Sequence, residues 1–126
     1  MQRLNVLVVD DSLITIKKVT AMLETLGHKV VRTALTGAEA MVAYQHSAPD
    51  LVTMDITMPD MDGIEATKRI VNAFPQARII MVTSHGQEQM VLSALDAGAS
   101  GYVLKPIKME KLTAMIAKVL KLKPMD

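Results

Sequence analysis

Short apolar runs that alternate with amphipathic stretches constrain the fold of this chain more than any other feature. The apolar runs are residues 4–9, 29–33, 51–54, 78–83 and 101–104. They are rich in Val, Ile, Leu and Met and are bounded by charged or turn-forming residues, which is typical of strands buried on both faces. Such strands are found almost only in parallel sheets that carry helices on both sides.

The stretches between and after these runs have helical periodicity. They are residues 12–26, 36–46, 62–73, 86–97 and 109–122. In the first of them, Ile16, Val19 and Leu23 share one face, whereas Lys17 and Lys18 lie away from it. Strand–helix alternation of this kind predicts an α/β fold, a doubly wound (βα)5 domain with a five-stranded parallel sheet. We expect a single domain over residues 1–126, with its core in residues 4–122.

Composition excludes several classes of protein. Half of the residues are hydrophobic, with 11 Met and only three aromatic residues, so the core is expected to be aliphatic and Met-rich. There is no Cys, the net charge is +1, and no apolar stretch reaches the ~18 residues of a membrane span. The chain is therefore expected to be cytoplasmic, without membrane insertion or nucleic-acid binding.

His28 and His46 are expected to lie at exposed helix ends, and residues 121–126 are expected to form a frayed tail.

Polar residues stand where four of the predicted strands end. Asp10 and Asp11 follow the first run, Asp55 the third, Thr83 ends the fourth, and Lys105 follows the fifth. Right-handed crossovers place the carboxyl ends of parallel strands on one edge of the sheet, where α/β proteins bind ligands. We therefore expect these side chains to lie close together, although each also fits an ordinary strand-end or helix-cap role by itself.

Clustered carboxylates repel one another and favour a bound cation, and Mg²⁺ is a natural choice because it takes oxygen ligands. A carboxylate beside such a metal is suited to attack phosphorus, with a lysine and a hydroxyl to bind the phosphoryl oxygens. Asp55 is the predicted phosphate acceptor. It directly follows the run 51–54 and precedes a turn in which Asp60 and Asp62 are expected to shape the loop and start the next helix.

Several motifs together resemble those of response-regulator receiver domains, in particular the stand-alone CheY type of bacterial chemotaxis. The motifs are VVDDS at 8–12, MDITMPDMDG at 54–63, VTS at 82–84 and GYVLKP at 101–106. The resemblance covers residues 4–122. It implies the flavodoxin-like receiver fold with strand order 2-1-3-4-5 and a cis Lys105–Pro106 peptide bond.

The resemblance also implies a role for each acidic position. Asp55 would receive a phosphoryl group from a sensor histidine kinase. Mg²⁺, or Mn²⁺ in its place, would be bound directly by Asp11, by Asp55 and by the backbone carbonyl of Thr57. Asp10 would act on the metal through water.

Further positions match the switch residues of the family. Thr83 and Lys105 would hold the phosphoryl group, and Tyr102 would change rotamer as Thr83 moves toward it, although core packing also accounts for a half-buried tyrosine. Thr57 and His85 would tune the rate of dephosphorylation. The protein is expected to promote only its own phosphorylation and dephosphorylation, and not to be an enzyme.

Because the chain has room for one domain, its output is expected to be a contact with another protein. The surface formed by the fourth helix, the fifth strand and the fifth helix would bind a target, such as the flagellar motor switch or an associated phosphatase. Residues 86–100 resemble chemotaxis members. A phosphorelay intermediate or another stand-alone receiver is the alternative.

Two other classes of protein also place ligands at this edge. Haloacid-dehalogenase-type phosphatases use an aspartate nucleophile in a D-x-D motif, whereas this chain has adjacent Asp10 and Asp11 and no room for a substrate cap. A flavodoxin-like nucleotide binder needs glycine, hydroxyl and backbone N–H groups in the first turn, where two acids would repel a phosphate.

Overall fold

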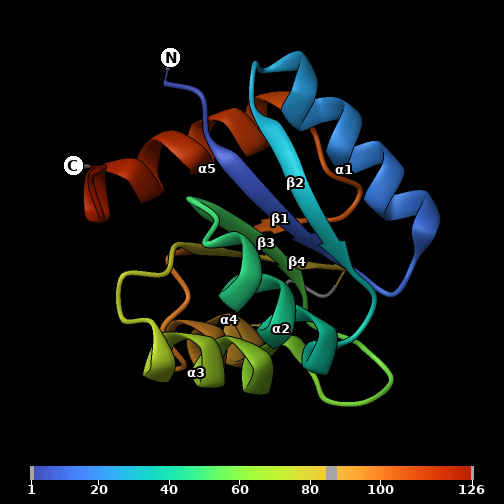
Figure 1. Cartoon of the computed structure of the whole chain (residues 1–126), viewed down its shortest axis with the longest axis vertical. Coiled ribbons are helices and arrows are strands. Elements are labelled where there is room, and N and C mark those ends of the chain that lie inside the picture. Colours follow the sequence, from blue (N-terminus) through green and yellow to red (C-terminus); the bar gives the residue numbers. More distant parts are fainter. Residues whose placement is uncertain (1, 85–87, 126) are drawn as a thin grey trace.

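The computed structural model describes residues 2–84 and 88–125. In this part of the chain, five parallel strands form one sheet in the order β2-β1-β3-β4-β5 (Figure 1). The strands are β1 (Asn5–Val9), β2 (Lys29–Ala34), β3 (Leu51–Asp55), β4 (Ile79–Thr83) and β5 (Gly101–Leu104). The predicted fold class and strand order are confirmed.

Helices cover both faces of the sheet (Figure 1). One face carries α1 (Leu13–Thr25) and α5 (Met109–Leu122); the other carries α2 (Gly37–Ser47), α3 (Gly63–Ala73) and α4 (Glu88–Asp96). Each face has its own buried apolar cluster. The start expected for α4 at residue 86 lies outside the described residues. Among the residues that the structure describes, no helix is long and apolar enough to cross a membrane.

The core is aliphatic and Met-rich, as its composition predicts. Met54 and Met81 are fully buried beside leucines, isoleucines and valines of the central strands. Tyr44 and Phe74 form an aromatic pair with ring centroids 4.8 Å apart. Unbranched thioether side chains adapt to irregular gaps, which suits a core that has few rings to fill space.

Among the helices whose start the structure describes, three begin at a side-chain cap that the sequence displays. Ser12, Thr36 and Asp62 precede α1, α2 and α3, and each side chain accepts a hydrogen bond from the backbone N–H three residues on. Such caps satisfy amides that have no partner within the helix. The predicted helix starts at residues 12 and 36, and the role of Asp62, are confirmed.

The expectation that His28 is exposed is wrong. Its side chain is only 4 % exposed, and its Nδ1 accepts a hydrogen bond of 3.1 Å from the Leu4 N–H. His28 lies just beyond the end of α1, but it contacts the start of the chain through Leu4, which local sequence does not reveal. His46 is exposed, as expected.

The expectation that the C-terminal tail is frayed is also wrong for residues 121–125, whereas residue 126 lies outside the described residues. The guanidinium of Arg78 donates to the carbonyl oxygens of Lys123 at 2.6 Å and Pro124 at 2.9 Å. A third bond, of 3.2 Å, runs from Arg78 Nη1 to the carbonyl oxygen of Asp50. Met125 packs on the apolar cluster beneath α1 and α5. Arg78 therefore ties the tail to the segments that lead into β3 and β4.

Candidate metal and phosphoacceptor site

The register of the central strands brings Asp10 and Asp55 side by side. Val9 of β1 pairs with Met54 of β3, and the residue that follows each of them is an aspartate, so the two aspartates lie at the same level. β1 and β3 are direct neighbours because the chain crosses over between them, with β2 placed outside. The carboxylates are thus 45 residues apart in the numbering and adjacent at the edge of the sheet.

The next two strands bring Thr83 and Lys105 to the same edge. Asp55 pairs with Val82, and Thr83 pairs with Leu104. The Lys105 N–H donates to the carbonyl oxygen of Thr83 at 2.8 Å. This bond places Lys105 directly beyond the ends of β4 and β5. The predicted convergence at one edge therefore follows directly from parallel pairing.

Asp10, Asp11 and Asp55 form a compact acidic cluster. Each offers a carboxylate oxygen, and these oxygens all lie within 4.8 Å of one another. Asp10 and Asp55 are 2 % and 5 % exposed, whereas Asp11 is exposed. Protein therefore buries two of the three carboxylates, and solvent reaches the cluster beside Asp11.

Lys105 bridges the two buried carboxylates. Its Nζ lies 3.0 Å from Asp10 Oδ2 and 3.4 Å from Asp55 Oδ1. Burial alone lowers the pKa of Lys105, but its hydrogen bonds and charge interactions with Asp10 and Asp55 together outweigh burial, so the pKa is raised. The ammonium group thus stays charged and lies close enough to Asp55 to contact a group bound to that carboxylate.

Asp55 has the perturbed acidity expected of a crowded, buried carboxylate. Burial is the largest cause and the charge of Asp10 the next, and together they raise the pKa of Asp55 from 3.8 to about 6. Lys105 opposes this shift without cancelling it.

Three carboxylates with one lysine leave an excess of negative charge that a hard divalent cation would offset. The donor set fits Mg²⁺, and carboxylate oxygens also suit Mn²⁺.

The two oxygens of Asp10 already have protein partners. Oδ1 accepts from the Ser12 N–H at 2.9 Å, and Oδ2 pairs with Lys105. Asp11 and Asp55 are therefore better placed to contact a metal directly. This supports the prediction that Asp10 acts through water, which stays a prediction.

The loop between β3 and α3, residues 56–62, closes tightly behind Asp55. The Gly63 N–H donates to the carbonyl oxygen of Ile56 at 2.6 Å. A Cβ at Gly63 would overlap the carbonyl oxygen of Asp55, so the close approach requires glycine. Thr57, whose carbonyl is the predicted third metal ligand, is an exposed residue of this loop.

Asp60 has a role that its neighbours in the sequence do not reveal. Its carboxylate oxygens accept from the N–H groups of Gly37 and Ala38, each at 2.9 Å. Asp60 thus caps α2, more than twenty residues earlier in the chain, while Asp62 caps its own helix. No local pattern reveals such a contact, because it depends on α2 and the loop meeting in the folded chain.

The remaining predicted residues lie near the site in different environments. Thr83 is buried at the end of β4, whereas Tyr102 on β5 is 37 % exposed. The Lys105–Pro106 peptide bond is cis, as the resemblance implies. His85 lies outside the described residues.

Residues 6–117 match the family model described as "Response regulator receiver domain". The chain belongs to the response-regulator receiver family. The receiver domain is 44 % identical over 115 residues to the chemotaxis protein CheY of Bacillus subtilis strain 168, covering 91 % of this chain and 96 % of that protein.

Solved structures give the same assignment. One match is a chain of the CheX–CheY–BeF3–Mg²⁺ complex of Borrelia burgdorferi, with a TM-score of 0.86 and 38 % identity, covering 94 % of this chain and 87 % of that one. Another is a LuxR-family response regulator of Aurantimonas sp. SI85-9A1, with a TM-score of 0.91 and 35 % identity, covering 97 % and 88 %. The receiver domain is thus of the kind used in two-component systems, and its CheY relatives connect it with chemotaxis.

Proposed function

We propose that this receiver domain takes a phosphoryl group from a histidine kinase onto Asp55, with Mg²⁺ bound by Asp11, Asp55 and the Thr57 carbonyl. The observation that carries the proposal is the acidic cluster with Lys105 in contact with two of its members. A metal-free site of this charge is unfavourable, and Asp55 is the member whose pKa is raised.

In the proposed step, a carboxylate oxygen of Asp55 attacks the phosphorus of a phosphohistidine. The new oxygen–phosphorus bond forms as the phosphorus–nitrogen bond breaks, and the imidazole leaves with the electron pair and gains a proton from solvent. Mg²⁺, when bound, neutralises the phosphoryl oxygens and aligns them for attack. Lys105 and the Thr83 hydroxyl would each bind a phosphoryl oxygen.

Asp55 is preferred over Asp10 as the acceptor because both oxygens of Asp10 are held by Ser12 and Lys105. This arrangement also argues against a phosphatase in which the aspartate of β1 is the nucleophile. We propose that the domain promotes only its own phosphorylation and dephosphorylation. Thr57 and His85 are proposed to tune the second step, so Ala at either position is expected to change the rate of phosphate loss.

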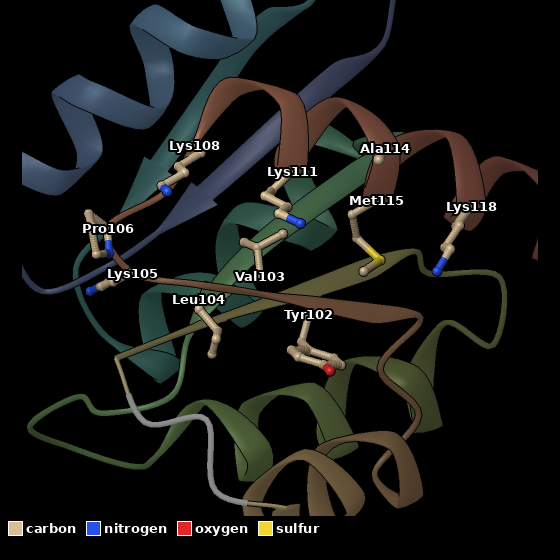
Figure 2. A pocket seen from close by; sticks show the side chains of 10 residues that line it. All are labelled: Tyr102, Val103, Leu104, Lys105, Pro106, Lys108, Lys111, Ala114, Met115 and Lys118. Carbon is tan, nitrogen blue, oxygen red and sulfur yellow. The ribbon is translucent and has the colours of Figure 1, made fainter.

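The proposed output surface includes a groove of about 540 Å³ between β5 and α5 (Figure 2). Lys111 and Lys118 extend from α5 toward β5, and Tyr102 and Leu104 project from one side of the strand (Figure 2). Basic side chains beside apolar ones suit an acidic, amphipathic segment of a target. Rotation of Tyr102, which is 37 % exposed, would change this surface after phosphorylation.

Acetyl phosphate with Mg²⁺ tests the acceptor directly. The intact mass of the wild type is expected to increase by one phosphoryl group, whereas Asp55→Asn and a wild-type sample with a chelator are expected to remain unchanged. No mass increase in the wild type, under conditions that label another receiver domain, would overturn the proposal.

The target can be tested with the phosphoryl mimic beryllofluoride. We propose chemotaxis as the process, so the mimic with Mg²⁺ is expected to increase binding to a purified flagellar motor-switch protein. If the domain does not bind that protein but transfers its phosphoryl group to or from a histidine-phosphotransfer domain, it serves a phosphorelay instead.

A further inference from the structure

The loop that follows Asp55 is docked on the start of α2. Both carboxylate oxygens of Asp60 accept hydrogen bonds there, from the Gly37 and Ala38 amides at 2.9 Å each. These bonds pull the pKa of Asp60 below its usual value, the bond from Ala38 being the largest cause. The loop is thus joined to α2 by an ionised carboxylate on two backbone amides.

Met61 strengthens this contact. A Cβ placed on Gly37 would overlap Cγ of Met61, so the methionine side chain lies directly against the first residue of α2. Two consecutive loop residues therefore meet α2, one through polar contacts and one through packing.

The other end of the loop is anchored at the sheet. The Ile56 N–H donates to the carbonyl oxygen of Val82 at 3.3 Å, and the Ile56 carbonyl oxygen accepts from Gly63 at 2.6 Å. Between Ile56 and Asp60 lie only Thr57, the buried Met58, and Pro59. The backbone of Thr57 is therefore held between two anchors, the sheet on one side and α2 on the other.

We propose that Asp60 is a positioning residue for the metal, which holds the loop on α2 so that the Thr57 carbonyl faces Asp11 and Asp55. This inference rests on the proposed function. Mg²⁺ requires near-ideal octahedral geometry, and a backbone carbonyl can be adjusted only by moving the loop itself. Asp60 bonds to α2 and is not a member of the acidic cluster, so it would act on the metal through Thr57.

Thr36 provides a matched control. Its Oγ1 caps the same end of α2 by accepting from the Glu39 N–H at 3.1 Å. Thr36→Ala therefore weakens the start of α2 about as Asp60→Ala does. Only Asp60→Ala, however, removes the hydrogen bonds between α2 and the loop.

The experiment measures Mg²⁺ dissociation constants by calorimetry for the wild type, Asp60→Ala, Asp60→Asn and Thr36→Ala. Asp60→Ala is expected to weaken Mg²⁺ binding roughly tenfold, the lower end of the range for partners of metal ligands. Asp60→Asn keeps one acceptor oxygen and is expected to fall between. Thr36→Ala is expected to stay within about twofold of the wild type. Hydrogen exchange at the Gly37 and Ala38 amides verifies that the loop has been released.

The outcomes separate the inference from the proposed function. A wild type that does not bind Mg²⁺ overturns the proposed function. A wild type that binds Mg²⁺, with Asp60→Ala binding equally well, overturns only the role of Asp60. Equal weakening by Asp60→Ala and Thr36→Ala would show that α2 stability matters and positioning does not, which also overturns it.

Discussion

At the scale of single residues, the acidity of Asp55 links the proposed chemistry to the stability of the fold. The pKa of Asp55 is about 6 in the folded chain and 3.8 when unperturbed, so the folded state retains its proton at a higher pH. An acid with a raised pKa makes folding less favourable as the pH rises, here from about 4 to about 6. At neutral pH the site thus opposes folding until a cation offsets its charge.

Asp55→Asn is accordingly expected to stabilise the metal-free protein at pH 7 by roughly 1–3 kcal/mol, since one pKa unit corresponds to about 1.4 kcal/mol. The gain should shrink toward zero as the pH falls below about 4, where the wild-type carboxyl is protonated in both states. Urea unfolding at several pH values measures it. Equal gains at acidic and neutral pH would contradict this origin.

His28 is expected to make the opposite contribution. Burial is the main cause that lowers its pKa below 6.5, and protonation would also place a donor on Nδ1 where the Leu4 N–H now donates. Its stabilisation is therefore present above pH 6.5 and is lost as the pH falls through the lowered pKa. In His28→Gln, an amide oxygen replaces Nδ1 as acceptor.

The loss of unfolding free energy between pH 7 and pH 5 should be smaller in His28→Gln than in the wild type. Nitrogen NMR should also find the proton of the neutral ring on Nε2. A proton on Nδ1 at neutral pH would rule out the hydrogen bond on which this prediction depends.

At the scale of elements, the turn from β3 into α3 determines the position of Asp55 at the edge of the sheet. Gly63→Ala forces its Cβ onto the Asp55 carbonyl oxygen, and backbone atoms cannot move aside as a flexible side chain can. The expected cost is about 2–3 kcal/mol, in the upper part of the range for overpacking. Phosphorylation by acetyl phosphate should also slow, because the shift moves Asp55 itself.

Gly101→Ala is the matched control for this prediction. Gly101 is also buried, but its added Cβ meets the flexible thioether of Met115. The cost should stay below about 1 kcal/mol, with phosphorylation unchanged. Similar losses of stability in both variants would mean that the added volume is responsible, and not the close approach of Gly63 to the Asp55 carbonyl oxygen.

At the scale of the whole molecule, the two edges of the sheet have separate tasks. The carboxyl edge holds the acidic cluster, while Arg78 precedes β4 and binds carbonyl oxygens at the opposite edge. Arg78→Met is expected to cost about 2 kcal/mol or more, because hydrogen bonds from a charged donor are lost. Hydrogen exchange should become faster at the amides of Lys123 and Met125, with phosphorylation of Asp55 unaffected.

Arg69→Met is the control for Arg78. Arg69 pairs only with Glu65, one turn away on the exposed face of α3, in the contacts described for it. Its replacement should cost less than about 0.5 kcal/mol. An equal effect of the two substitutions would contradict the view that Arg78 ties the tail to the sheet.

Much of the fold was predictable because its signals are local. The bounds predicted for β5 and α5 match the structure, since an apolar run and a 3.6-residue stripe are visible in the sequence itself. Asp10, Asp11, Asp55 and Lys105 were predicted to meet because parallel strands bring their carboxyl ends to one edge. The burial of His28 and the anchoring of the tail were not predicted, because each depends on segments far apart in the chain.

The sequence by itself determined the strand–helix alternation, the capped helix starts and the acids at strand ends, since all follow from neighbouring residues. Only the tertiary structure decided which groups these acids contact. Lys105 bonds to both Asp10 and Asp55, and Asp60 bonds to the start of α2, more than twenty residues earlier in the chain. The physical reason is that hydrogen bonds and charge pairs act over a few ångströms in space, whatever the separation of their residues along the chain.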